Sequence, residues 1–360
     1  MIARSQSSFL RTEALRAAGA TAAGIAVFAV AWSLLHAGFW DDYQIVDTPV
    51  YQSYGERMLD GEVPYRDFGV EYPPAALPVF LLPSLSAGES YGRFFEALML
   101  VFGAAGIALM ALALAALGAS TPRLYGAVLL AAVAPLLLGT VILTRYDLWP
   151  ALLVAASLAA LLVGRDRLGL GILGLAVAAK VYPLVLLPLA LAYLGKRKGR
   201  HEALAGLVAF LAVLLVVFLP FLVVAPGGLL ESLQNQAGRP LQIESLGAGF
   251  LLAGQQLGLY EASVVSTHGS QNLDGPGADA IATVQTIAQA LAVIAVWAVF
   301  ARGRADGERL VAASAAAVVA FVAFGKVLSP QYLVWLILLV PLVGGAGGVL
   351  AGGLFAAALV

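Results

Sequence analysis

Residues 168–194 read LGLGILGLAVAAKVYPLVLLPLALAYL, an apolar run long enough to cross a membrane but interrupted at its centre. Proline removes an amide donor and disfavours helix in the residue before it, so we predict a break at Lys180-Val181-Tyr182-Pro183. Each half holds roughly 12 residues, or about 18 Å of helix. The stretch therefore predicts two short helices in a hairpin, with Lys180 near the turn.

The composition of the whole chain places this hairpin in a membrane protein. Hydrophobic residues make up 61% of the 360 residues and charged residues 11%, whereas soluble domains carry about 25% charged residues. Apolar runs near the length that spans about 30 Å of hydrocarbon recur throughout. We predict an all-α polytopic membrane protein, a single transmembrane domain over residues 1–360 with roughly 9–11 transmembrane or re-entrant helices.

Charged breaks between the apolar runs set the predicted spans. They lie at residues 17–35, 94–117, 124–143, 148–163, 203–224, 281–300, 310–327 and 332–349. Residues 74–87 are apolar but short and hold three prolines, so we expect them to dip into the membrane or lie on its surface. Because the chain ends in another apolar run, 350–360, a truncated C-terminus is left open.

Basic residues cluster in the short segments GRDR, residues 164–167, and GKRKGRH, residues 195–201. Short loops rich in Lys and Arg stay in the cytoplasm, which predicts a cytoplasmic N-terminus. The two long polar loops, residues 36–73 and 225–280, are then extracytoplasmic. The abundance of Ala, Gly, Leu and Val hints at a GC-rich bacterial genome, so we expect a bacterial inner (plasma) membrane.

Several kinds of chemistry are excluded. The chain has no cysteine, so disulfides, thiol catalysis and cysteine-based metal sites are ruled out. Its three histidines are scattered, which argues against a histidine metal cluster. The net charge of −1 gives no indication of nucleic-acid binding.

The first long loop concentrates polar chemistry in VDTPVYQSYGERMLDGEVPYRDFGVEYPP, residues 46–74. A helix at its start would align Asp47, Tyr51 and Tyr54 on one face. The prolines that follow bound a rigid, non-helical piece that holds Tyr65, Arg66, Asp67, Glu71 and Tyr72. Most of the loop's acids are expected to be solvated or helix-capping, but a loop stiffened by prolines and aromatics indicates a function for at least one.

Further polar groups reach the same predicted face of the membrane: Arg145 and Asp147, Lys180, Lys326 with Gln331 and Tyr332, and Arg239 with Gln242 and Glu244. Cations at membrane depth usually face a polar cavity or pair with an anion. A local ion pair between Arg145 and Asp147, and snorkelling of Lys180 and Lys326 to the interface, are the simpler alternatives.

These residues fall into an ordered set of motifs. The motifs are Asp47-x-x-Val50-Tyr51, Gly61-x-x-Pro64-Tyr65-x-Asp67-Phe68, Tyr72-Pro73-Pro74, Lys180-x-Tyr182-Pro183, Arg239-Pro240-Leu241-Gln242-Ile243-Glu244-Ser245 and Ser329-Pro330-Gln331-Tyr332-x-x-Trp335. Together they resemble the GT-C class of membrane glycosyltransferases, and most closely glycosyltransferase family 87, the mannosyltransferases that use polyprenyl-phosphate-mannose.

The resemblance implies a GT-C-like bundle that transfers a sugar, most simply mannose, from a polyprenyl-phosphate donor. The acceptor would be a hydroxyl of a glycolipid, polysaccharide or protein on the extracytoplasmic side. In an inverting displacement, one carboxylate accepts the acceptor's proton. The leaving phosphate is already a stable anion, so it needs positive charge rather than a general acid.

The resemblance also implies roles for individual residues. We expect Asp47 to be the catalytic base, with Asp41 and Asp42 as alternatives. The donor phosphate would bind Lys180, Lys326, Arg239 and Arg145. The sugar or acceptor would contact Tyr51, Tyr65, Arg66, Asp67, Glu71, Tyr72, Gln242, Glu244, Gln331 and Tyr332. We expect no metal site and no certain cofactor, although some enzymes of this class use a divalent ion.

Two other functions are compatible with the sequence. A transporter or flippase of lipid-linked sugars would need charged residues along a path through the whole membrane. A structural or regulatory protein could keep the fold without the activity. The predicted polar groups gather on one side of the membrane, which favours the enzyme over the transporter.

Overall fold

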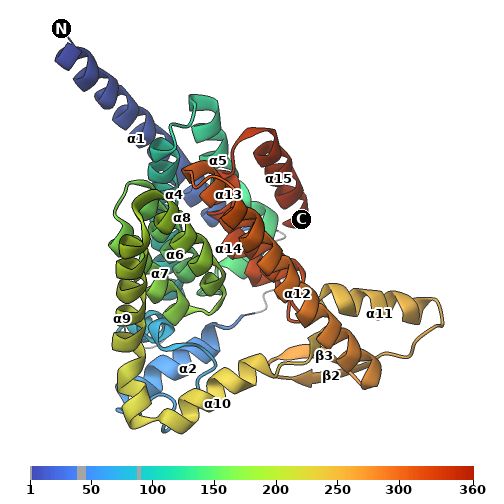
Figure 1. Cartoon of the computed structure of the whole chain (residues 1–360). Coiled ribbons are helices and arrows are strands. Elements are labelled where there is room, and N and C mark those ends of the chain that lie inside the picture. The colour runs from blue at the N-terminus through green and yellow to red at the C-terminus, as the bar shows by residue number, and fades with distance from the viewer. Residues whose placement is uncertain (1, 39–45, 87–90) are drawn as a thin grey trace.

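The computed structural model describes residues 2–38, 46–86 and 91–360. Within them, five helices are long and apolar enough to cross a membrane by length and composition. These are α1 (Ile2–Leu34), α4 (Tyr91–Ala116), α5 (Thr121–Leu138, extended to Ile142 by a 3₁₀ turn), α9 (Arg200–Val224) and α12 (Pro276–Arg302). They confirm the predicted spans at 17–35, 94–117, 124–143, 203–224 and 281–300, and with them the all-α polytopic membrane class. Figure 1 shows their arrangement.

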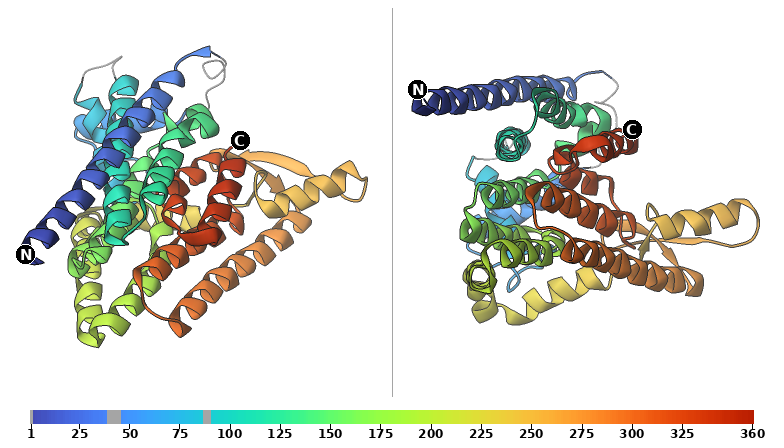
Figure 2. Two further views of the ribbon diagram at one scale, coloured as in Figure 1. Left: turned by 90° about the horizontal axis from the view of Figure 1, so that it is seen from above. Right: turned by 45° about the horizontal axis from the view of Figure 1, so that its top comes forward.

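The centre of the bundle is α6 (Leu148–Leu162), which packs against α4 and α7 (Asp166–Ala179). Nearly all of its side chains are buried. A helix that is apolar on every side is stable only when surrounded by other apolar surfaces, which explains its central place. By contrast, α1 lies at the edge of the bundle along α4 and α5 (Figure 2).

The broken apolar run forms the predicted hairpin. Helix α7 ends at Ala179, a 3₁₀ turn covers Tyr182–Leu186, and α8 (Leu187–Lys198) returns. Asp166, at the start of α7, forms an ion pair with Lys198, at the end of α8, so the two outer ends meet. Lys180 therefore sits at the tip.

The last predicted spans are partly wrong. Helix α13 (Gly307–Ala323) matches the prediction for 310–327, but residues 332–349 form no continuous helix. They hold the 3₁₀ turn Pro330–Leu333, α14 (Val334–Ile337) and the 3₁₀ turn Val340–Leu342, followed by α15 (Gly345–Ala358). Pro341 lacks an amide donor and Gly345 has φ of 72°, so the chain breaks between α14 and α15.

The first long loop contains regular structure that supports its polar groups. Helix α2 (Thr48–Leu59) begins directly after Asp47, as predicted. After the non-helical piece come the 3₁₀ turn Pro74–Ala76 and α3 (Leu77–Ser84), which packs against α2 and α4. The short apolar segment at 74–87 is thus helical over most of its described length, and Phe80 is fully buried.

The second long loop is more ordered than its sequence indicates. It holds α10 (Pro226–Ala237), β1 (Leu241–Gln242), α11 (Leu246–Gln256), β2 (Ser263–Thr267) and β3 (Ser270–Asp274). The antiparallel strands lie in the order β1-β3-β2. The Ser- and Gly-rich composition of this part favours a plain loop, but the residues form a β-hairpin instead. His268 and Gly269 both have positive φ, the geometry of a two-residue hairpin turn.

Basic side chains gather at one end of the bundle. Arg167 of α7 pairs with Glu202 of α9 at 3.0 Å, and Arg123 of α5 donates to Glu308 of α13 at 2.5 Å. Lys196 donates to the carbonyl of Gly303, between α12 and α13, at 2.8 Å. The hairpin tip with Lys180 and the segments before α6 and after α13 lie at the other end, beside α2 and α10 (Figure 1).

Candidate active site

A buried aspartate lies at the heart of the polar cluster. Asp147, the residue before α6, is 0% exposed. Its Oδ1 accepts hydrogen bonds from Lys180 Nζ at 2.5 Å and from Trp335 Nε1 at 2.5 Å. Lys180 therefore points into the protein toward an anion, and the snorkelling alternative for this lysine is wrong.

Aromatic rings enclose the Lys180 ammonium group. Its Nζ lies 4.7 Å from the centre of the Tyr146 ring, 5.2 Å from Trp335 and 5.6 Å from Tyr332. Trp335 is stacked between Tyr182, at 3.9 Å, and Tyr332, at 4.3 Å. A cation over aromatic faces is stabilised by their electron density, so these rings hold the charge that Asp147 balances.

A second carboxylate–cation pair joins the first loop to the bundle. Asp47 forms an ion pair with Arg145, whose side chain is 9% exposed. Arg145 thus pairs with Asp47 rather than with its near neighbour Asp147. Asp47 also accepts a hydrogen bond from the Tyr51 hydroxyl at 3.3 Å, because the helical spacing of four places both on one face. The alternative bases Asp41 and Asp42 lie outside the described residues.

Packed aromatic rings connect the two pairs. Tyr51 is fully buried and stacks on Phe80, with ring centres 4.4 Å apart. It also makes edge contacts with Tyr72 at 5.7 Å and Tyr146 at 5.8 Å. A direct sugar contact of Tyr51 or Tyr72 stays a prediction, but in this structure the Tyr51 ring supports Asp47 and packs beside Tyr146.

The proline-bounded piece is non-helical, as predicted, and its residues contact the bundle. Tyr65 has φ of 66°, which is uncommon for a residue other than glycine. Its hydroxyl donates to the Tyr72 carbonyl at 2.5 Å, and its ring meets Phe221 of α9 edge-on at 5.2 Å. The carbonyl of Glu71, an exposed residue, accepts from Gln236 of α10 at 3.1 Å. The piece therefore bridges α9 and α10.

Two charges of this piece neutralise each other at the surface. Arg66 donates to Asp67 at 2.8 Å, and this hydrogen bond, with the Val63 amide, lowers the pKa of Asp67 to about 2. Burial raises the pKa of nearby Tyr54 to about 12. Asp67 is therefore ionised and the Tyr54 hydroxyl neutral throughout the physiological range. Contacts of Arg66 or Asp67 with a sugar stay predictions.

Two cations, Arg239 before β1 and Lys326 after α13, have hydrogen-bond partners that carry no charge. Arg239 donates to the His268 carbonyl at 3.2 Å and to Ser270 Oγ at 3.1 Å. Lys326 Nζ donates to the Ala237 carbonyl at 3.2 Å. The backbone carbonyl of Lys326 accepts from the backbone N–H of Gln242 at 3.0 Å. The Gln242–Lys326 hydrogen bond joins the segment of β1 to the segment that leads on to Tyr332 and Trp335. Glu244 is exposed.

Several polar atoms of this region are buried without a hydrogen-bond partner among the described residues. They are Arg145 Nε, Asp147 Oδ2, Tyr182 OH, Arg239 Nε, Gln242 Oε1 and Gln331 Oε1. Leaving such a group unsatisfied costs about 1–3 kcal/mol. Their concentration around the two pairs is the pattern expected where a polar ligand binds.

The strongest missed residues are Asp147 and Trp335. From the sequence, Asp147 was predicted only as a local partner for Arg145, and Trp335 was noted only as the final residue of the motif that begins at Ser329. The sequence did carry an indication of both residues, since each follows polar residues at the predicted face of the membrane. Their contact with Lys180 was not foreseeable, because the three residues come from separate segments.

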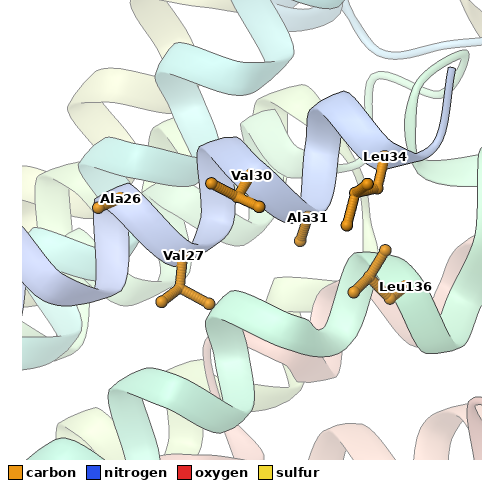
Figure 3. A pocket seen from close by; sticks show the side chains of 6 residues that line it. All are labelled: Ala26, Val27, Val30, Ala31, Leu34 and Leu136. Atoms are coloured by element: carbon orange, nitrogen blue, oxygen red, sulfur yellow. The ribbon is translucent and has the colours of Figure 1, made fainter.

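Other features of the described part carry less chemistry. No group of three or more His, Cys, Asp or Glu side chains there could hold a metal ion, and independence from a metal stays a prediction. A groove of about 260 Å³ lies between α1 and α5, lined by Ala26, Val27, Val30, Ala31, Leu34 and Leu136 (Figure 3). All six side chains are apolar, so it can hold a hydrocarbon chain but cannot transfer a proton.

Comparison with known proteins matches this geometry to one family. A family model described as Glycosyltransferase family 87 matches residues 71–330. The matched region contains Arg145, Asp147, Lys180, Arg239 and Lys326. Asp47 precedes it and Trp335 follows it. No curated protein sequence matched the chain.

Proposed function

The chain belongs to glycosyltransferase family 87 and is a multi-pass membrane protein, and from this premise we propose that it uses a polyprenyl-phosphate sugar as donor. Mannose is the sugar we expect. The acceptor is a hydroxyl of a glycolipid, polysaccharide or protein, reached at the extracytoplasmic surface of a bacterial inner membrane. The reaction is an inverting displacement.

The observation that carries the proposal is the pairing of two carboxylates with cations at one end of an apolar bundle. A lipid-linked donor presents its phosphate and sugar where the hydrocarbon phase meets water. Asp47–Arg145 and Asp147–Lys180 lie beside the loops that cover this end. A base and a set of cations in one place are the two elements that sugar transfer from a phosphate requires.

Asp47 is the base in this proposal. Arg145 and the Tyr51 hydroxyl fix the orientation of its carboxylate, and an oriented, charge-assisted contact positions a group more precisely than a solvated one. The carboxylate accepts the proton of the acceptor hydroxyl as that oxygen attacks the anomeric carbon. The bond from that carbon to the phosphate oxygen breaks, and polyprenyl phosphate leaves as an anion.

Arg239 and Lys326, whose hydrogen-bond partners are neutral, are the preferred ligands for the donor phosphate. Asp47 and Asp147 already balance Arg145 and Lys180, whereas Arg239 and Lys326 donate only to carbonyl and hydroxyl oxygens in the contacts described above. The region thus holds four cations (Arg145, Lys180, Arg239 and Lys326) against the two paired carboxylates. The excess positive charge supports binding of an anion there, with Arg239 and Lys326 as the leading ligands.

The distribution of basic residues supports the proposed orientation of the protein in the membrane. The basic side chains of the α4–α5, α6–α7, α8–α9 and α12–α13 connections gather at the end opposite the candidate site. Basic connections stay in the cytoplasm. The candidate site would then face the extracytoplasmic side, where a flipped lipid-linked sugar is available.

The direct test is sugar transfer by the purified full chain in proteoliposomes, with radiolabelled polyprenyl-phosphate-mannose and a membrane glycolipid extract as acceptor. We expect Asp47→Asn to lower the rate by about 10²–10⁴-fold, the usual contribution of a general base. Asp60→Asn, which removes an exposed carboxylate of the same loop to which no role is assigned, is the matched control. Full activity of Asp47→Asn would remove it as the base, and Asp41→Asn and Asp42→Asn then identify the alternative.

A further inference from the structure

Helix α11 presents an apolar face that nothing in the described chain covers. Its sequence LGAGFLLAGQQ has no charged residue, and the first eight side chains are all apolar or glycine. Leu246, Phe250 and Leu257 are 48%, 70% and 74% exposed. At 100° per residue these three and Ala253 fall on one narrow stripe. In water such a stripe would be an exposed apolar patch running the length of the helix.

The opposite face of α11 is already occupied. Ala248, Leu251 and Leu252 pack with Leu241 of β1 and Leu273 of β3 in a small separate core. Figures 1 and 2 show α11 and the β2–β3 hairpin projecting together from the bundle beside α12. The sheet therefore covers one side of α11 and leaves the stripe on the other. A helix that is apolar on both sides needs an apolar environment on both.

The position of α11 along α12 indicates what that environment is. The Gly247 amide donates to Gln285 Oε1 of α12 at 2.9 Å. Helix α12 has 27 residues and is about 40 Å long, whereas about 20 residues span the hydrocarbon. Counted from Arg302 at its basic end, the opposite hydrocarbon boundary falls near Ile281–Gln285. Helix α11 thus crosses α12 at the level of the membrane surface.

Helix α12 itself carries an exposed apolar face near this crossing. On the spanning helix α12, Val284, Ile287 and Leu291 lie at and after the crossing, all exposed on one face. We propose that α11 is an interfacial helix, seated in the surface of the bilayer with its Leu246–Phe250–Ala253–Leu257 stripe among the lipids and the β2–β3 hairpin on the water side. The inference does not depend on the sugar transferred.

The absence of cysteine from the chain gives a clean test. A nitroxide is attached to single-cysteine variants of the full chain in phosphatidylcholine–phosphatidylglycerol vesicles, and its accessibility to oxygen and to a water-soluble nickel chelate is measured by electron paramagnetic resonance. Phe250→Cys and Ala253→Cys report the stripe. Gln255→Cys is the control, because it lies about 140° around the helix from Phe250.

We expect both stripe positions to favour oxygen over the nickel chelate, at a depth of roughly 5–10 Å, and position 255 to show the reverse. Greater accessibility to nickel at both stripe positions would place the stripe in water and overturn the proposal. Protection from both reagents that disappears when the protein is diluted in lipid would show that a second copy covers the stripe, which also overturns it. Two stripe variants keep the test valid if one fails to fold.

Discussion

At the residue scale, Asp147 shows how the apolar bundle tolerates charge. One carboxylate oxygen receives two donors, and the ammonium of Lys180 that supplies one of them lies among aromatic rings. Burying such a pair is costly, and the cost is repaid only while both partners remain. The pair is therefore better understood as a device that fixes positions at the site than as a source of stability.

Removing one partner of this pair should be strongly destabilising. We expect Lys180→Met to lower the free energy of unfolding by about 3–5 kcal/mol, because Asp147 would stay buried as an unbalanced charge. Thermal unfolding in detergent measures the change. The double variant Lys180→Met/Asp147→Asn should recover part of the loss. Arg66→Gln is the exposed control, with a change of about 0–1 kcal/mol. Unaltered stability of Lys180→Met would refute the buried-pair interpretation.

The Tyr51 hydroxyl should affect rate more than stability. Tyr51→Phe removes the hydrogen bond to Asp47 but retains the ring on Phe80. A hydrogen bond to a charged group contributes about 1.5–3 kcal/mol, and at 3.3 Å this one belongs at the low end, so we expect about a tenfold lower kcat. The unfolding temperature should hardly change. Tyr54→Phe is the control, and equal effects of the two variants would count against a role for the Tyr51–Asp47 contact.

At the element scale, the α7–α8 hairpin carries Lys180 to the site, and its own position depends on close packing of α7 against α9. A Cβ at Gly174 would lie 2.6 Å from the Phe210 backbone oxygen of α9. A Cβ at Gly171, also in α7, would meet only Val213 Cγ2 at 3.6 Å, an ordinary contact. Small residues at helix crossings allow such approach in membrane proteins.

The same substitution at these two glycines should therefore act in opposite directions. Gly174→Ala forces α7 away from α9, and we expect it to destabilise the protein by about 1–3 kcal/mol. Gly171→Ala gains helix propensity of up to about 1 kcal/mol without a clash. Thermal unfolding and sugar transfer of both variants check this pair. Equal stability of the two would show that α7 and α9 lie further apart than the structure places them.

At the scale of the whole molecule, the charge distribution predicts how the bundle sits in the membrane. Single cysteines at Ser266, in the β2–β3 hairpin, and Arg304, between α12 and α13, lie at opposite ends. In intact cells, a membrane-impermeant maleimide should label Ser266→Cys and reach Arg304→Cys only after permeabilisation. The reverse pattern would invert the orientation and place the candidate site in the cytoplasm.

Local patterns in the sequence determined the membrane class, the five long spans and the hairpin around Lys180. Apolar length and the effect of proline act within one segment, so they can be interpreted without the rest of the fold. Ordered motifs likewise indicated the family that the comparison then confirmed. The same local rules failed at residues 332–349 and at the β2–β3 hairpin, where burial of short turns and strand pairing outweighed composition.

Only the tertiary structure decided which charges meet. Sequence proximity favoured an Arg145–Asp147 pair, whereas the fold joins Asp47 to Arg145 and Asp147 to Lys180 and Trp335. These partners come from separate elements, and no periodicity within a segment encodes their distance. Packing of α2, α6, α7 and α14 around one end of the bundle brings them together, because each element must bury its own apolar face before its polar residues acquire neighbours.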